Sequence, residues 1–268
     1  IIFSINFLML GYFKTTTDVG IYAVVSKLGN LVSLPLVSFN TIFAPMISEF
    51  YSRNETKKLE DLFKTVTKWI FTISLPVFLI FILFAQPIMG IFGQSFVIGA
   101  VALIIFGAGE LINAGVGSVG IMLTMTGRPK INLLNSILLC ALNIVLNYLL
   151  IPKYGIIGAA IATGLSIAII NILGLVEVYY FLKIHPFRLN YLKPCIAGLL
   201  PFFLMYIVVH KFFPVSLSLL DMSLLSLFFV SLYIFFIFLF KLEKEDKYVL
   251  NLIHQKLINF KSGFSNAE

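Results

Sequence analysis

Long apolar runs separated by short polar segments repeat along the whole chain. A run of about 18 or more apolar residues is long enough to cross a bilayer as a helix. The runs are continuously apolar and do not alternate, which excludes a strand-built membrane barrel. The pattern therefore predicts an all-α, polytopic transmembrane helix bundle with one partial and seven complete spans. Their approximate ranges are 1–13, 19–48, 66–92, 97–126, 131–151, 155–182, 194–213 and 219–240.

The composition agrees with a membrane protein. Of 268 residues, 60% are hydrophobic and 12% are charged, whereas a soluble domain carries about 25% charged residues. The chain starts at Ile1 within an apolar run and without an initiator Met, so we expect an N-terminal part to be missing. The two cysteines, Cys140 and Cys195, lie in or beside apolar runs and suggest neither a disulfide framework nor a metal site.

The basic residues lie in loops on alternate sides of the predicted membrane. One side carries Arg53, Lys57, Lys58, Lys64, Lys68, Arg128, Lys130, Lys183, Arg188 and Lys193, and the tail adds Lys241, Lys244, Lys247, Lys256 and Lys261. The other side carries only Lys14, Lys153 and Lys211. Cytoplasmic loops are the basic ones, so we predict a multi-pass protein of the inner, cytoplasmic membrane with its C-terminus in the cytoplasm. This placement argues against a nucleic-acid partner, despite the net charge of +7.

Two charged segments are expected at the cytoplasmic surface. Ser52 and Glu55 have the spacing of a capping box, and we expect the charged stretch 55–68 to continue into the next span. The segment 241–268 has apolar residues at helical spacing and predicts an amphipathic helix in the membrane interface; a frayed tail is the alternative.

Lys27 lies inside the second span. Placing a charged side chain within the bilayer costs free energy, so such a residue usually faces a cavity or a partner. Polar residues accompany it at helical spacing: Ser26, Asn30, Ser33 and Asn40. Pro35 and Pro45 should bend this helix, because each removes a backbone donor. A bent helix with a polar face and one cation suits the wall of an anion-accepting cavity. The alternative is that Lys27 extends to the outer headgroups.

Two carboxylates also lie within spans. Glu110 is near the middle of its span, with Asn113, Gly117 and Thr124 on roughly the same face. It could carry a proton or meet a cation, or it could make a structural hydrogen bond to a neighbouring helix. Glu177 is closer to the cytoplasmic end, where exposure at the interface is expected.

The fifth span has a stripe of polar residues along one face: Asn132, Asn135, Ser136, Cys140, Asn143 and Asn147. Such amides can hydrogen-bond sugar hydroxyls in a hydrated passage, or they can join two helices. Because six polar residues follow one another along this face, the hydrated passage is the favoured interpretation. No catalytic motif accompanies these residues, and we expect no metal and no cofactor.

Several runs resemble one known family. They are Leu-Gly-Tyr-Phe at 10–13, Val-Gly-Ile-Tyr at 19–22, Thr-Gly-Arg-Pro-Lys at 126–130 and Ile-Pro-Lys-Tyr-Gly-Ile-Ile-Gly-Ala-Ala at 151–160. With Asn143 and Asn147, these runs resemble the polysaccharide flippases (O-antigen and lipid-linked oligosaccharide) of the multidrug/oligosaccharidyl-lipid/polysaccharide exporter superfamily. The resemblance covers roughly residues 8–240.

The resemblance implies a fourteen-helix plan in two lobes. Residues 1–182 would be the second lobe (helices 7 to 12), 183–240 an additional hairpin (helices 13 and 14), and 241–268 the tail. It also implies flipping of a polyprenyl-pyrophosphate oligosaccharide from the cytoplasmic to the outer leaflet by alternating access, for a surface polysaccharide such as the O-antigen of lipopolysaccharide. Membrane lipids would be partners, and so would a glycan polymerase or glycosyltransferases.

The implied roles fall on the intramembrane polar residues. Lys27 would meet the pyrophosphate, and Glu110 is the weaker candidate for ion coupling. The amides expected to line the substrate cavity are Asn30, Asn40, Asn135, Asn143 and Asn147. A cation-coupled drug antiporter of the same superfamily is the alternative, and would favour acidic cavity residues over Lys27. A membrane-embedded glycan-modifying enzyme is less consistent with the short outer loops.

Overall fold

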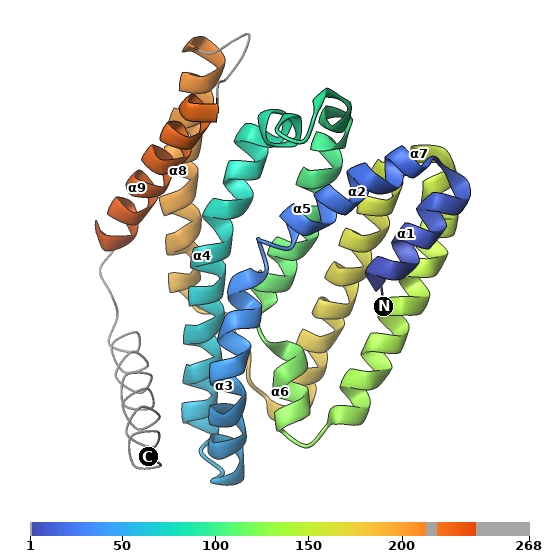
Figure 1. The fold of residues 1–268 in the computed structure, drawn as a ribbon. Coiled ribbons are helices and arrows are strands. Elements are labelled where there is room, and N and C mark those ends of the chain that lie inside the picture. Colours follow the sequence, from blue (N-terminus) through green and yellow to red (C-terminus); the bar gives the residue numbers. More distant parts are fainter. Residues whose placement is uncertain (1, 213–218, 240–268) are drawn as a thin grey trace, which may run out of the picture.

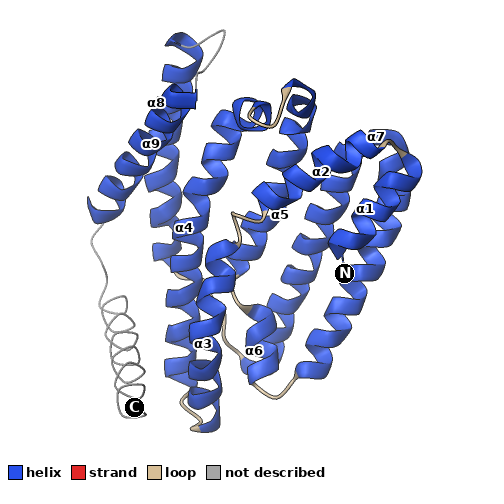
Figure 2. Cartoon of the chain, in the orientation of Figure 1, coloured by secondary structure: helices blue, strands red, loops and turns tan. Residues whose placement is uncertain are grey.

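The computed structural model describes residues 2–212 and 219–239, and this part of the chain is helical, without strands (Figures 1 and 2). In chain order the elements are α1 (Ile2–Phe13), α2 (Thr16–Gly29), α3 (Leu34–Ser52), α4 (Thr56–Gly90), the 3-10 helix η1 (Gln94–Gly99), α5 (Ala100–Val116), α6 (Val119–Met125), α7 (Pro129–Leu182), the 3-10 helix η2 (Leu189–Tyr191), α8 (Leu192–Phe212) and α9 (Leu219–Leu239). The all-α class is confirmed. The predicted tail helix lies outside the described residues.

The second predicted span is divided. Helices α2 and α3 meet at an angle of 49° across residues 30–33. Pro35 lies in the first turn of α3. Backbone N–H groups in the first turn have no partner within the helix, so a proline there costs no hydrogen bond. Pro45 lies inside α3, and the helix continues past it. The bend is therefore present, and it falls beside Pro35.

The prediction of one continuous helix at 97–126 is wrong. This segment begins with the end of η1, and α5 then stops at Val116 because Gly117 adopts a φ of +80°, which an α-helix does not permit. The chain resumes as the short helix α6. A Cβ atom at Gly117 would lie 2.2 Å from the hydroxyl oxygen of Thr67 on α4, so the break also requires the absence of a side chain.

Helix α7 doubles back on itself. A straight helix of its 54 residues would be about 80 Å long, far more than a bilayer requires. Gly155, with φ +55° and ψ −127°, interrupts it, and Figure 1 shows two antiparallel limbs side by side. At this break the Lys14 ammonium donates to the carbonyl oxygen of Pro152 at 3.1 Å.

Within the described residues, five helices are long and apolar enough to cross a membrane, or six if the bent pair α2–α3 is one span. That number counts α7 once, although Gly155 divides it into two limbs. The predicted count of seven complete spans stays a prediction.

Close backbone contact joins α5 to the second limb of α7. A Cβ atom on Gly109 would lie 2.5 Å from the Cα atom of Gly164. Helices α8 and α9 pack instead along α4, where the Tyr233 hydroxyl donates to the carbonyl oxygen of Thr72 at 2.8 Å. The division into a lobe at 1–182 and a hairpin at 183–240 stays a prediction.

The predicted capping box at Ser52 is wrong. Ser52 is the last residue of α3, and its hydroxyl donates to the Glu49 carbonyl. The structure has its capping box at Thr15 and Asp18, at the start of α2. The expectation for 55–68 is confirmed, because α4 runs from Thr56 through this stretch into the apolar part, and its kink comes only at Phe84.

The connections between helices fall at two ends of the bundle. Figure 1 shows the α3–α4, α6–α7 and α7–α8 connections at one end, and the α1–α2 connection with the turn of α7 at the other. The first end carries ten of the loop cations and is here called the basic end. The segregation of charge expected from the sequence is thus reproduced in three dimensions.

Candidate functional site

One face of α2 and α3 is left uncovered by the described part of the chain. Seven of its exposed residues recur every three or four positions, with the exposed Val37 and Ile42 beside them: Lys27, Leu31, Leu34, Ser38, Thr41, Pro45 and Ser48. We call these seven residues the α2–α3 stripe. It is amphipathic, and its cation is Lys27. Nothing in residues 2–212 or 219–239 buries it.

The polar residues predicted to accompany Lys27 do not all share its face. Ser26 and Ser33 are buried, with 3% and 7% of their surface exposed. Asn30 and Asn40 are half-buried at the edges. Lys27 lies in the last turn of α2, where a cation interacts favourably with the helix dipole. The structure therefore separates an outward cation from inward serines.

Glu110 lies against the break between α2 and α3. It is 4% exposed, and the Asn113 amide donates to its carboxylate at 3.2 Å. The Ser33 hydroxyl, which belongs to the break, donates to the Asn30 carbonyl oxygen at 3.3 Å and lies near this carboxyl group. The contact with Asn113 follows from helical spacing, whereas the contact with Ser33 depends on how the two helices pack. Thr124, predicted on the same face, belongs to α6 beyond the break at Gly117.

A buried polar network joins α1, α2 and both limbs of α7. The Asn6 amide donates to the Tyr22 hydroxyl at 3.1 Å and to the Thr163 hydroxyl at 2.9 Å. The Asn147 amide donates to the side-chain oxygen Oδ1 of Asn6 at 2.6 Å and to Oδ1 of Asn143 at 2.9 Å. The five residues are at most 1% exposed. Their hydrogen bonds hold four helical segments together.

The predicted polar stripe of the fifth span is thus directed mainly toward other helices. Asn143 and Asn147 belong to the network, and Asn135 donates to the Glu177 carboxylate at 2.5 Å across the two limbs of α7. Glu177 is half-buried, which differs from the interfacial exposure expected for it. This packing fits the helix-joining alternative for these amides better than a hydrated face.

Sequence reasoning missed three members of the network. Asn6, Tyr22 and Thr163 stand singly in apolar surroundings, and no local pattern marks them. Asn6 was nevertheless detectable in principle, since a lone amide in a span needs a partner. Two of its partners, Asn147 and Thr163, are 141 and 157 positions away, so the sequence could not reveal the pairing.

The family model MatE matches residues 1–149, which is more than half of the chain. The chain belongs to the MatE family. No group of three or more His, Cys, Asp or Glu gathers as metal ligands in the residues described.

Curated relatives of this MatE-family chain are named as flippases or polysaccharide proteins. "Probable low-salt glycan biosynthesis flippase Agl15" of Haloferax volcanii is 28% identical over 166 residues, which are 62% of this chain and 35% of that protein. "Probable flippase AglR" of the same organism is 31% identical over 62% of this chain and 36% of that protein. "Capsular polysaccharide biosynthesis protein CapF" of Staphylococcus aureus is 28% identical over 61% and 41%, respectively. The matches thus span about two fifths or less of each relative.

A solved structure shares the fold. "Lipid II flippase MurJ, inward closed conformation" superposes with a TM-score of 0.63 at 18% identity, over 90% of this chain and 51% of that one. The likeness confirms the exporter-type helix bundle predicted from the sequence. It also means that this MatE-family chain corresponds to about half of such a fold.

The network yields a prediction about stability. Thr163→Val keeps the shape of the side chain and removes the hydroxyl that Asn6 and Tyr22 contact. Leaving buried donors unpaired costs about 1–3 kcal/mol, so the variant should unfold at a lower temperature in detergent. Thr41→Val is the matched control, because that hydroxyl is exposed and bonds only within its own helix. Equal unfolding temperatures for the two variants would contradict a stabilising role for the network.

Proposed function

We propose that the complete protein is a flippase that moves a polyprenyl-pyrophosphate oligosaccharide from the cytoplasmic to the outer leaflet of the cell membrane. It would act by alternating access, without making or breaking a covalent bond, in the synthesis of a surface polysaccharide. Glycosyltransferases or a glycan polymerase would be its partners in that synthesis. The supporting observation is an exporter-type bundle that leaves a cation-bearing face uncovered.

The uncovered face is suited to line a passage. The α2–α3 stripe combines apolar residues, which tolerate a lipid chain, with hydroxyls and the Lys27 ammonium. A pyrophosphate carries several negative charges, and Lys offers it a point-charge contact without the bidentate geometry of Arg. Asn30 and Asn40, at the edges of this face, would hydrogen-bond sugar hydroxyls. Asn135, Asn143 and Asn147 would keep the helices of this half rigid as it moves.

The first test concerns Lys27. In the complete protein, Lys27→Ala should lower surface-glycan export on the order of tenfold, because a hydrogen bond to a charged group is worth about 1.5–3 kcal/mol. Lys27→Arg should retain most export, and Lys153→Ala, which removes an exposed cation at the turn of α7, is the matched control. Export is measured by surface-glycan staining and membrane insertion by immunoblot. Normal export by Lys27→Ala would remove this residue from the mechanism.

Glu110 is the candidate for ion coupling. Its buried carboxyl group lies against the α2–α3 break through Ser33, so gain or loss of a charge there would act on the angle between the two helices. A cycle that alternates access needs such a connection between charge and shape.

Glu110→Gln keeps the hydrogen bond from Asn113 but cannot ionise, and we expect it to lose most export while the protein remains folded. Glu177→Gln is a close control, since Glu177 also lies in a span and accepts a hydrogen bond from an asparagine. If both variants export alike in the same staining assay, Glu110 has only a structural role.

The proposed orientation places the basic end and the C-terminus in the cytoplasm, in accordance with the charge bias of membrane loops. Single cysteines at Asn54 and Asn190, in a variant lacking Cys140 and Cys195, should resist a membrane-impermeant maleimide in intact cells and react after permeabilisation. A cysteine at Thr17, in the first turn of α2 beside the α1–α2 connection, should react in intact cells. The reverse pattern of labelling would overturn the orientation and the direction of transport with it.

A further inference from the structure

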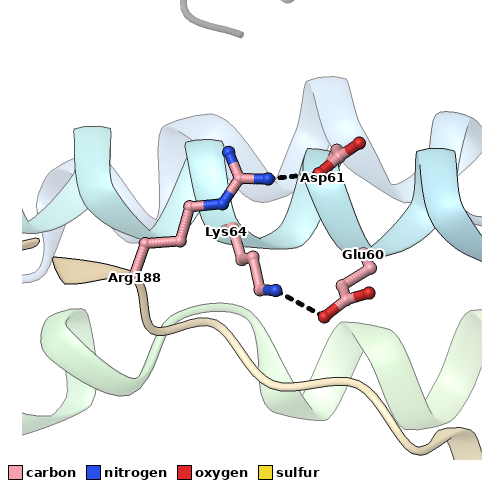
Figure 3. A network of polar contacts seen from close by, with 4 residues as sticks. All are labelled: Glu60, Asp61, Lys64 and Arg188. Atoms are coloured by element: carbon pink, nitrogen blue, oxygen red, sulfur yellow. Dashed lines mark hydrogen bonds and ion pairs between the residues drawn. The ribbon is translucent and has the colours of Figure 1, made fainter. Parts of the chain in front are cut away.

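Several cations of the basic end are paired with carboxylates of α3, α4 or the connection between them. The pairs are Arg53–Glu49, Lys58–Glu55, Lys64–Glu60 and Arg188–Asp61, and Figure 3 shows the last two. An ion pair compensates much of the charge of its cation. These four cations are therefore poor candidates for attracting a further anion.

The cations at the two ends of α7 have no such partner. Arg128 and Lys130 flank the first residue of this helix, and Lys183 follows its last residue. Because the two limbs are antiparallel, both ends of α7 lie at the basic end (Figure 1). Within the described residues, none of the three cations forms an ion pair with a carboxylate. Glu177, the nearest carboxylate along α7, accepts a hydrogen bond from an asparagine instead. The positive charge at the ends of α7 is thus uncompensated.

Aromatic rings hold two of these cations close to each other. The Arg128 guanidinium lies 4.8 Å from the centre of the Phe181 ring, and the Lys183 ammonium lies 5.3 Å from the centre of the Tyr180 ring. The two rings meet edge to face, with their centres 5.0 Å apart. A ring attracts a cation without cancelling its charge. The cations are therefore held in position and remain attractive to an anion.

The backbone around the two cations favours the same arrangement. Lys183 adopts a φ of +58°, in the left-handed region that favours glycine. Nη1 of Arg128 donates to the carbonyl oxygen of Thr126 at 3.0 Å, and a guanidinium has further N–H groups with which to bind a phosphate. The N-terminus of α7 begins beside Arg128, and its partial positive charge also favours an anion. Cations that are already positioned lower the entropic cost of binding.

An apolar face of the second limb of α7 leads to the two rings. Exposed residues recur there every three or four positions, each with 47% to 67% of its surface exposed: Leu165, Ile169, Ile172, Val176 and Tyr180. From Leu165 to Val176 this face is about 16 Å long, close to the depth of one leaflet of a hydrocarbon core about 30 Å thick. Tyr180 then lies where tyrosine is enriched, at the membrane–water interface. A lipid has the same order of apolar chain and charged headgroup.

We propose that Arg128 and Lys183 bind the phosphate of an anionic phospholipid from the leaflet at the basic end. The acyl chains would lie along the face from Leu165 to Val176, and the glycerol would contact the rings of Tyr180 and Phe181. Basic sites at the cytoplasmic ends of transmembrane helices recognise acidic lipids in this way. The bound lipid is not transported, so the site is distinct from the α2–α3 stripe. By contacting both ends of α7, the lipid would hold the two limbs together at the end opposite their turn.

The test compares lipid binding to two charge-matched variants of the complete protein, purified in detergent, by native mass spectrometry. The unmodified protein should bind phosphatidylglycerol more tightly than phosphatidylcholine, because phosphatidylcholine brings a cation of its own. The site variant Arg128→Gln with Lys183→Gln should weaken phosphatidylglycerol binding on the order of tenfold.

The control variant is Arg53→Gln with Lys57→Gln. It also removes one arginine and one lysine from the basic end, but from α3 and α4, and it breaks the ion pair between Arg53 and Glu49. It should change phosphatidylglycerol binding by less than about twofold, because exposed cations at a distance are screened.

Several outcomes would overturn the proposal. Equal weakening in both double variants would mean a diffuse effect of charge, and no weakening in the site variant would remove Arg128 and Lys183 from lipid binding. Displacement of phosphatidylglycerol by millimolar inorganic phosphate would identify a site for free phosphate. Displacement by an equimolar polyprenyl pyrophosphate would assign the site to the transported substrate.

Folding of both double variants is checked by thermal unfolding. Should the site variant fail to fold, Lys183→Gln and Lys57→Gln as single variants give the same comparison, because the hydrogen bond between Arg128 and Thr126 is then kept. The measurement needs no transport, so its result is independent of whether the protein flips a lipid-linked glycan.

Discussion

A bilayer offers no water to backbone N–H and C=O groups, so every such group must find its partner within the protein. This constraint explains why the described chain is helical and why backbone groups at helix breaks have partners, as three of the breaks show. At residues 30–33 the repair is a series of backbone turn bonds. At the turn of α7, Lys14 donates to the carbonyl of Pro152. Beside the α5–α6 break, Tyr191 donates to the carbonyl of Gly115.

The same interruptions connect distant parts of the protein. Because a broken helix needs partners from elsewhere, each break ties its helix to another element: Lys14 precedes α2, and Tyr191 ends the linker to α8. Glu110 on α5 reaches the α2–α3 break through Ser33. The breaks are therefore the points at which separate helices of the bundle are joined.

Two kinds of polar residue in the spans serve different purposes. Those of the buried network, such as Asn6 and Thr163, hydrogen-bond across helices and resist separation of the helices, since an unpaired amide in this environment is costly. Those of the α2–α3 stripe, such as Lys27, face outward and have no such role within the described residues. In the sequence both kinds are single polar residues within an apolar run, so only their burial in the structure distinguishes them.

The amino-acid sequence by itself determined the fold class, the segregation of basic loops and the presence of a bend in the second span, because apolar length, loop charge and proline chemistry act locally; that the bend falls before Pro35 and not at Pro45 came from the structure. Only the tertiary structure decided which asparagines face other helices, where the helix breaks at Gly117, and that the capping box is at Thr15 and not at Ser52. The hydrogen bond between Asn6 and Asn147 spans 141 positions, and the ion pair between Asp61 and Arg188 spans 127. Such contacts depend on how whole helices pack, and no local pattern of residues encodes that packing.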